Sequence, residues 1–247
     1  MPASALLIGA SIASLNLCTD EYLLLLARPG EVASVSFLSQ DPLESPLWRS
    51  ARRYPANHGS IEDVLTRRPG VVLTMGGGGR ATRLLARRLR IRPVELVSPG
   101  SLQDVSSNLR TVAAALGEPR RALPWLERLE RLQRTRPAAA RDAVWLSSGG
   151  QTLAAGSIGS HWLRLAGLEQ RALPGGRASL ETLLVRPPAV LVRSRYRSAQ
   201  VSSGARWLDH PMVRKANARR LTADGRAWTC MGPLMIGEIE RLRTGLR

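Results

Sequence analysis

The feature that most constrains the fold is a short sequence element that occurs twice. Residues 60–73 read SIEDVLTRRPGVVL and residues 179–192 read SLETLLVRPPAVLV. The copies lie 119 residues apart and share a serine, a glutamate, a leucine, an arginine, a proline and a valine. In each copy the serine is a helix-capping residue, a proline ends the helix, and a β-branched run follows. A helix that leads into a strand in both halves predicts two related lobes. Chance similarity between helix-proline-strand sequences is the alternative.

The rest of the chain alternates short β-like runs with amphipathic segments. Strands of the first half are predicted at 10–16, 31–38, 71–75 and 93–98. Helices of the first half are predicted at 18–27, 60–68, 80–89 and 101–117. After a charged helix with a seam of leucines, at Leu123, Leu126, Leu129 and Leu132, the same alternation restarts. This order is typical of parallel sheets flanked by helices.

The predicted fold is therefore α/β, with two lobes that each hold a parallel-rich central sheet flanked by helices. The N-terminal lobe is predicted at residues 1–118, a single long connecting helix at 119–137 and the C-terminal lobe at 138–247.

The net charge of +17 raises the question of a nucleic-acid partner. Lys215 is the only lysine among the 36 basic residues, and the arginines are spread along the chain. Aromatic residues make up only 4% of the chain, which is few for base stacking. We therefore expect no nucleic-acid partner and favour a basic cleft for an anionic small ligand. No run of about 20 apolar residues is present, so no membrane-spanning segment is predicted.

The motifs of common catalytic and metal sites are missing from the sequence. The two cysteines, Cys18 and Cys230, form no metal-binding motif with the three histidines. The glycine run 76–79 is followed by Arg80 and Ala81 instead of the Lys-Ser/Thr of a phosphate-binding loop. We expect no catalytic residues, no metal site and no enzyme activity.

The order and spacing of several segments resemble one known family. These segments are SLNLCTDEYLLLLA near the start, the repeated S-[IL]-E-x-[VL]-L-x-R-x-P block, SLQDVSSNLRTVAAALG, HWLRLAGLE and LDHPMV. Together they resemble the periplasmic substrate-binding proteins of ABC importers for iron-siderophores, haem and cobalamin. The resemblance covers nearly the whole chain. It implies two α/β lobes joined by a rigid helix, with a ligand cleft between the lobes.

The resemblance also implies a partner. In that family a glutamate on each lobe pairs with arginines of the two-fold transporter, and the matching residues here are Glu62 and Glu181. Two carboxylates on separate lobes would steer docking to the permease. The alternative is that each glutamate only stabilises the first turn of its own helix.

Ligands of α/β lobes lie at the carboxyl ends of the strands. The residues expected to contact a ligand there are Asn16, Thr19, Ser39, Gln40, Trp48, His58, Gly77, Arg80, Gln151, Arg195, Tyr196 and Trp228. Arg193, Arg195 and Arg197 should share one side of a strand end, with Tyr196 on the other. Each assignment has an alternative: the arginines would lie on the surface without a ligand, His58 would have a structural role, and Trp48 and Trp228 would belong to the core.

Several chelates are candidates for the ligand. The arginines favour an anionic chelate such as an iron-siderophore, bound without a covalent cofactor. Haem, cobalamin and a hydrophobic cargo are alternatives, and the stretches YPANHG and LPGGRA lack the aromatic pair that cobalamin binders of the family tend to use.

Because the chain resembles periplasmic substrate-binding proteins, we expect it to be located in the periplasm. MPASALLIGAS lacks the basic segment of an intact signal peptide, so the leader is either clipped or absent from this chain. A disulfide between Cys18 and Cys230 is one prediction for that compartment, and two free thiols are the alternative. A monomer that meets the membrane only through the transporter is expected.

Overall fold

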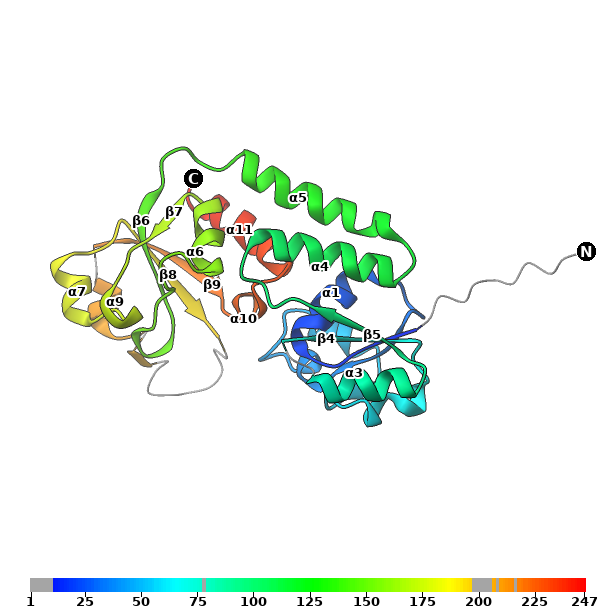
Figure 1. Cartoon of the computed structure of the whole chain (residues 1–247). Coiled ribbons are helices and arrows are strands. Elements are labelled where there is room, and N and C mark those ends of the chain that lie inside the picture. Colours follow the sequence, from blue (N-terminus) through cyan, green and yellow to red (C-terminus); the bar gives the residue numbers. More distant parts are fainter. Residues whose placement is uncertain (1–10, 77–78, 197–205, 208, 216) are drawn as a thin grey trace, which may run out of the picture. The chain divides into compact units, whose positions relative to one another are not determined.

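The structure is a computed structural model that describes residues 11–76, 79–196, 206–207, 209–215 and 217–247 (Figure 1). Contacts divide the chain into two compact units. The first unit contains the chain up to Pro42, Leu47–Ser98 and Ser106–Leu123. The second unit contains Leu43–Pro46, Pro99–Val105 and Pro124–Arg247. Each unit has its own sheet, as the repeated element predicts.

The first unit is built on a five-stranded parallel sheet with the order β3-β2-β1-β4-β5. Its strands are β1 (Ile12–Ser14), β2 (Val32–Ser36), β3 (Ala56–Asn57), β4 (Val71–Met75) and β5 (Arg92–Leu96). Its α-helices are α1 (Leu17–Leu26), α2 (Trp48–Ala51) and α3 (Gly79–Arg88), with part of α4 (Leu102–Ala115). Its short 3-10 helices are η1 (Phe37–Gln40), η2 (Glu62–Arg67) and η3 (Pro119–Ala122).

The second unit is built on a four-stranded parallel sheet with the order β7-β6-β8-β9. Its strands are β6 (Arg141–Leu146), β7 (Leu168–Gln170), β8 (Val190–Arg195) and β9 (Arg219–Asp224). Its helices are α5 (Leu123–Arg134), η4 (Ser148–Gly150), α6 (Ile158–Leu165), η5 (Pro174–Gly176), α7 (Leu180–Val185), α9 (Pro211–Lys215), α10 (Ala227–Cys230) and α11 (Leu234–Gly245). Helices cover both faces of this sheet, α7 and α9 on one and α6 and α11 on the other (Figure 1).

The two copies of the repeated element occupy the same position in their sheets. The strand of the first copy is β4, which lies between β1 and the edge strand β5. The strand of the second copy is β8, which lies between β6 and the edge strand β9. The order β2-β1-β4-β5 thus corresponds to β7-β6-β8-β9.

The core contacts of the two copies also correspond. In the first unit Val64 of η2 packs in one apolar cluster with Val72 of β4. In the second unit Leu183 of α7 packs in one cluster with Leu191 of β8, and these are the matching positions of the repeat. All four side chains are at most 1% exposed. Full burial of such a side chain stabilises the fold by about 1.5–3 kcal/mol, so each copy fastens its helix to its sheet.

The caps of the two copies follow the same rule. The Ser60 hydroxyl accepts a hydrogen bond from the Asp63 amide at 3.2 Å, and the Ser179 hydroxyl accepts one from the Thr182 amide at 2.9 Å. The capped helix differs, however. The first copy is a 3-10 helix followed by Arg68, which has a φ of 46°, whereas the second is an α-helix. The helix predicted at 60–68 is therefore present as a shorter 3-10 helix.

Three further predictions need correction. The connecting segment predicted at 119–137 is not one helix: η3 precedes α5, because Pro124 has no N–H to donate to the carbonyl four residues earlier. The leucine seam is incomplete, since Leu129 and Leu132 are buried while Leu123 is 48% exposed. The short strands β3 and β7 were not predicted from the sequence. Among the described helices, none combines the length and the apolar character that crossing a membrane requires.

Candidate functional site

The predicted ligand-contacting residues follow the strands at the carboxyl edge of each sheet. Since all pairings in both sheets are parallel, these loops gather at one edge of each unit.

The loop after β1 is held by a capping box. The Asn16 carboxamide oxygen accepts from the Thr19 amide at 3.0 Å, and the Thr19 hydroxyl accepts from the Asn16 amide at 3.4 Å. Asn16 Nδ2 also donates to the Met75 carbonyl at 3.4 Å, which ties this loop to the end of β4. Thr19 is fully buried, and its hydroxyl lies 2.7 Å from that of Ser14. Thr19 thus supports the loop from inside, while the half-buried Asn16 is partly accessible.

Asp20 is a buried carboxylate that the sequence analysis did not single out. Both of its carboxylate oxygens accept from the Ser36 amide at 3.1 Å, and the Ser36 hydroxyl also donates to it. Burial raises the pKa of Asp20 to about 7, although the hydrogen bonds from Ser14, Ser36 and Ser39 oppose that rise. Asp20 therefore links α1 to the end of β2. An acidic residue between Thr19 and the apolar run that follows is the only sequence signal for it.

The loop after β2 contains three of the predicted residues. Ser39 is fully buried and donates to the Ser36 carbonyl at 2.8 Å. Gln40 Nε2 donates to the Tyr54 carbonyl at 2.8 Å. Trp48 begins α2 and is half-buried, with the guanidinium groups of Arg49 and Arg52 at 4.5 Å and 4.7 Å from its ring. Of the three, Trp48 is the one whose side chain is mainly apolar and not fully buried.

His58 lies on the surface beside an aromatic residue that sequence reasoning missed. Its side chain is 77% exposed, and its ring lies 5.3 Å from that of Phe37, the only phenylalanine in the chain. Phe37 is itself 48% exposed. The His58 amide donates to Asp63 at 3.0 Å, which fixes the backbone and leaves the imidazole accessible. Phe37 and His58 together form an exposed aromatic pair at the carboxyl edge of the first sheet.

Two predicted residues, Gly77 and Arg197, lie outside the described residues. Arg80 lies in α3, which directly follows the loop after β4.

In the second unit the loops after β6 and β8 carry Gln151, Arg195 and Tyr196. Gln151 is exposed and pairs with Arg177 through a backbone bridge. Arg193 and Arg195 both donate to Asp209, the latter at 3.1 Å, so these two guanidinium groups share one side of the strand end. The Tyr196 hydroxyl donates to the carboxylate of Glu44, in the segment 43–46 that groups with this unit. Asp209 and Glu44 thus partly neutralise the basic surface that the sequence predicts here.

Trp228 lies in the core of the second unit. It is 4% exposed, and its ring packs against that of Trp145 at 5.2 Å. The indole N–H groups of both tryptophans are buried without a hydrogen-bond partner among the described residues. A buried N–H without a partner costs about 1–3 kcal/mol. Trp145 and Trp228 therefore place two indole N–H donors without a described partner in the core of the second unit.

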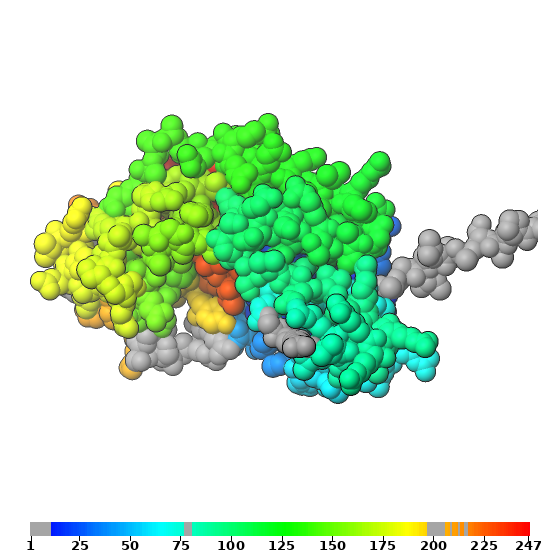
Figure 2. Space-filling view, viewed as in Figure 1, coloured from blue at the N-terminus to red at the C-terminus, as the bar shows by residue number. Residues whose placement is uncertain are grey.

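Glu62 and Glu181 are exposed at the start of their helices. Each stands two residues after its capping serine, and each is followed after three residues by an exposed leucine. Leu65 is 37% exposed and Leu184 is 40% exposed. In Figure 2 the yellow segment that contains α7 lies at the surface of its unit. Each copy of the repeat thus displays a carboxylate and an apolar side chain together.

The remaining predictions concern cysteines and metals. Neither Cys18 nor Cys230 is a free thiol in the structure. Within the described ranges, no three histidine, cysteine or carboxylate side chains gather closely enough to hold a metal ion.

Comparisons with known proteins identify the fold. No family model matches the chain, and no curated protein matches it. Among solved structures, the periplasmic heme-binding protein HutB of Vibrio cholerae matches with a TM-score of 0.74 at 19% identity, over 96% of this chain and 99% of that one. The periplasmic heme-binding protein RhuT of Roseiflexus sp. RS-1 matches at 0.69 and 20%, over 96% and 97%. The periplasmic vitamin B12-binding protein BtuF of Vibrio cholerae matches at 0.65 and 20%, over 97% of each chain. The chain has the fold of these periplasmic binding proteins, and the predicted α/β class is confirmed.

Proposed function

We propose that this protein is a substrate-binding receptor that captures a metal chelate and delivers it to an ABC importer. The observation that carries the proposal is the fold match over nearly the full length of both chains, to proteins that bind heme or vitamin B12. We propose a periplasmic location on the same ground. A receptor of this kind releases its ligand unchanged, so we expect no turnover.

The ligand we favour is an anionic chelate, either haem or an iron-siderophore. The Phe37–His58 pair offers a flat apolar surface and an imidazole that can ligate iron. Arg195 is 43% exposed and can pair with a ligand carboxylate while it keeps Asp209 as a second partner. Cobalamin is the alternative ligand, and the arginine-rich composition favours it less because arginine pairs best with anionic groups.

The direct test is an absorbance titration with haemin, a ferric siderophore and aquocobalamin, together with native mass spectrometry of protein purified from its own host. We expect a saturable spectral change with one chelate and a mass that matches protein plus that chelate. Binding of none of the three, with no co-purified coloured ligand, would contradict the proposed function.

We also propose that the repeated element docks the receptor to the two-fold permease. Glu62 and Glu181 would pair with basic residues of the permease, and Leu65 and Leu184 would bury apolar surface beside those pairs. The proposal is supported by the recurrence of an exposed apolar side chain at the same position in both copies, beside the glutamate. If the glutamates served only to stabilise the first turn of their helices, that role would not account for the exposed leucines beside them.

The cysteines fit an oxidising compartment, where disulfides persist. We propose that Cys18 and Cys230 are paired with each other in the exported protein. Mass analysis under non-reducing conditions tests the pairing, and detection of two free thiols would contradict it.

A further inference from the structure

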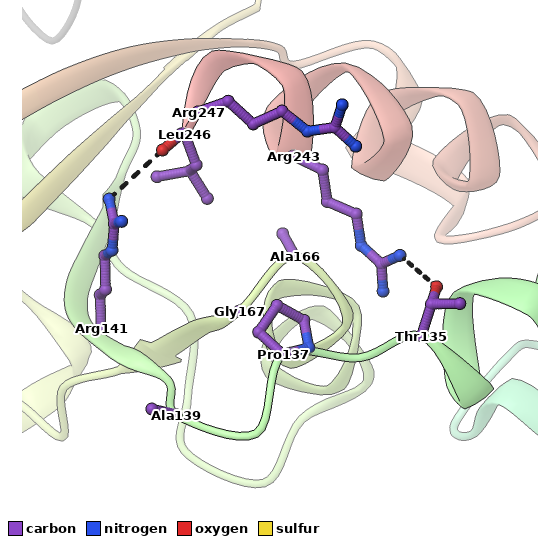
Figure 3. A pocket seen from close by; sticks show the side chains of 9 residues that line it. All are labelled: Thr135, Pro137, Ala139, Arg141, Ala166, Gly167, Arg243, Leu246 and Arg247. Atoms are coloured by element: carbon purple, nitrogen blue, oxygen red, sulfur yellow. Dashed lines mark hydrogen bonds between the residues drawn. The ribbon is translucent and has the colours of Figure 1, made fainter.

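A pocket of about 480 Å³ lies on the second unit, where the connection between α5 and β6 passes the end of α11 (Figure 3). Three of the side chains around it are arginines, namely Arg141, Arg243 and Arg247. No acidic side chain is present among its described lining residues. The volume is in the range of small-molecule sites, which is roughly 300–1,000 Å³.

This pocket is distinct from the loops predicted to contact the transported ligand. Arg141 is the first residue of β6, and Gly167 immediately precedes β7. Both therefore lie at the amino edge of the second sheet. Gln151, Arg195 and Tyr196 follow the strands at the carboxyl edge of the same sheet. A ligand in the pocket would not occupy the site proposed for the chelate.

Arg243 is held at the pocket by the ends of two other helices. Its Nε donates to the Leu165 carbonyl at 2.7 Å, its Nη1 to the Thr135 hydroxyl at 2.7 Å and its Nη2 to the Leu132 carbonyl at 2.6 Å. A guanidinium group has five N–H donors, so two remain after these bonds. Burial lowers the pKa of Arg243, and the nearby carboxylate of Glu240 opposes that shift. An anion in the pocket would offset the loss of solvation that burial causes.

Arg141 and Arg247 are less engaged than Arg243. Arg141 makes one long hydrogen bond, from Nη1 to the Leu246 carbonyl at 3.5 Å. The Arg247 side chain has no hydrogen bond with any residue in the described part of the chain. In Figure 3 the Arg243 and Arg247 side chains both extend from the end of α11, whereas Arg141 extends from the start of β6 on the other side of the pocket. Most of the donors of Arg141 and Arg247 are therefore available for a ligand.

Part of the pocket lining is apolar. Pro137, Ala166 and the Leu246 side chain supply carbon surface between the arginines. Gly167 has a φ of +79°, and a Cβ atom there would lie 2.7 Å from Pro137 Cγ. The backbone of the turn therefore packs directly on the proline ring. A ligand that fits this arrangement combines an apolar body with an anionic group.

We propose that this pocket binds a small organic oxyanion, with its phosphate or carboxylate between Arg141, Arg243 and Arg247 and its apolar body on Pro137 and Ala166. Guanidinium groups suit such oxyanions because they donate paired, charge-assisted hydrogen bonds. The site is independent of the proposed transport function, because none of its residues belongs to the loops at the carboxyl edge or to the repeated element.

The test is a calorimetric titration of the full chain with phenyl phosphate, inorganic phosphate and benzyl alcohol at low ionic strength. We expect saturable binding of phenyl phosphate that is tighter than binding of either fragment alone. Arg141→Gln and Arg247→Gln should each weaken phenyl phosphate binding about tenfold, since each removes one charge-assisted contact. If Arg141→Gln fails to fold, Arg247→Gln still tests the pocket, because the Arg247 side chain forms no hydrogen bond with a described residue.

The matched control is Arg134→Gln, an exposed arginine of α5 that does not line the pocket. It changes the net charge equally and should leave the affinity unchanged. Equal weakening by Arg134→Gln would overturn the site in favour of non-specific charge attraction, as would the absence of saturable phenyl phosphate binding. A third overturning result is binding to vesicles of phosphatidylglycerol and phosphatidylcholine that depends on Arg141 without any binding of phenyl phosphate, because the surface would then recognise a membrane.

Discussion

Arg121 binds the carboxylate of Glu31 at both oxygens: Nη2 donates to Oε1 at 2.7 Å, and Nη1 donates to Oε2. Nη1 also donates to the Leu26 carbonyl at 3.3 Å. The arginine side chain is 13% exposed and the glutamate side chain 22% exposed, so water screens the pair only in part. This pair fastens η3 to the connection between α1 and β2 inside the first unit.

We expect Arg121→Ala to lower the free energy of unfolding by about 2–3 kcal/mol, because it leaves a partly buried carboxylate without its partner. Chemical denaturation measures the change. Arg83→Ala is the matched control, since its pair with Glu95 is 43% and 39% exposed and should contribute about 0–1 kcal/mol. Equal effects of the two substitutions would show that the Arg121 pair is no more than a surface ion pair.

The same pair predicts a dependence on pH. The Arg121 guanidinium holds the pKa of Glu31 below its ordinary value of 4.5. A carboxyl group with a lowered pKa in the folded state stabilises the protein above its unfolded pKa, and this stabilisation is lost as the pH falls further. The difference in unfolding free energy between the wild type and Glu31→Gln should therefore be constant near neutral pH and shrink below about pH 4.5. A difference that does not shrink would contradict the assignment.

Asp20 should make the free energy of unfolding depend on pH in the opposite direction to Glu31. Burial raises its pKa from 3.8 to about 7, so between these values the folded protein holds a proton that the unfolded chain has released. The unfolding free energy should then fall as the pH rises from about 4 to about 7, by at most about 4 kcal/mol. Asp20→Asn cannot titrate and should lack this fall. Parallel denaturation series for both proteins provide the measurement, and curves that keep a constant separation across that range would show that Asp20 ionises normally.

The features of the fold that follow from local sequence could be predicted. The serine cap, the apolar run and the proline of the repeat are readable within about ten residues, and they place β4 and β8 correctly. The strands β3 and β7 have only two and three residues, and their pairing comes from neighbouring strands that lie far away in the sequence. A short strand without its own alternation gives no local signal.

The roles of polar residues were harder to predict, because they depend on contacts between distant segments. Thr19 and Ser39 follow strands as ligand-contacting residues often do, yet both are fully buried and bonded within the first unit. The contact between Phe37 and His58 joins two loops that no pattern connects. The pairing of Arg193 and Arg195 with Asp209 similarly crosses a long connection.

The exposed aromatic pair predicts where a chelate makes contact in the first unit. If haem is the ligand, His58→Ala should weaken haemin binding about tenfold or more, since it removes an iron ligand, and should alter the absorbance spectrum of the complex. Phe37→Ala should weaken binding less and leave the spectrum unchanged, because it removes only apolar contact. His161→Ala, on α6 of the second unit, is the control. A spectrum that is unaltered in His58→Ala would exclude His58 as an iron ligand.

The repeated element predicts how transport fails when docking is lost. Glu62→Ala combined with Glu181→Ala should reduce uptake through the cognate permease at least tenfold, because each removes an exposed carboxylate that would pair with the permease. The affinity for the chelate should stay unchanged, because neither glutamate is among the residues expected to contact the ligand. Leu65→Ser combined with Leu184→Ser should reduce uptake by a smaller factor, since partial burial of two leucines contributes less than two charge pairs at a desolvated interface.

The control is Glu127→Ala combined with Glu130→Ala, on the exposed side of α5. It changes the net charge equally and should leave uptake intact. If the control pair reduced uptake as much as the repeat pair, overall charge would explain the loss. If the Glu62 and Glu181 substitutions left uptake intact, the two glutamates would have no role beyond their own helices.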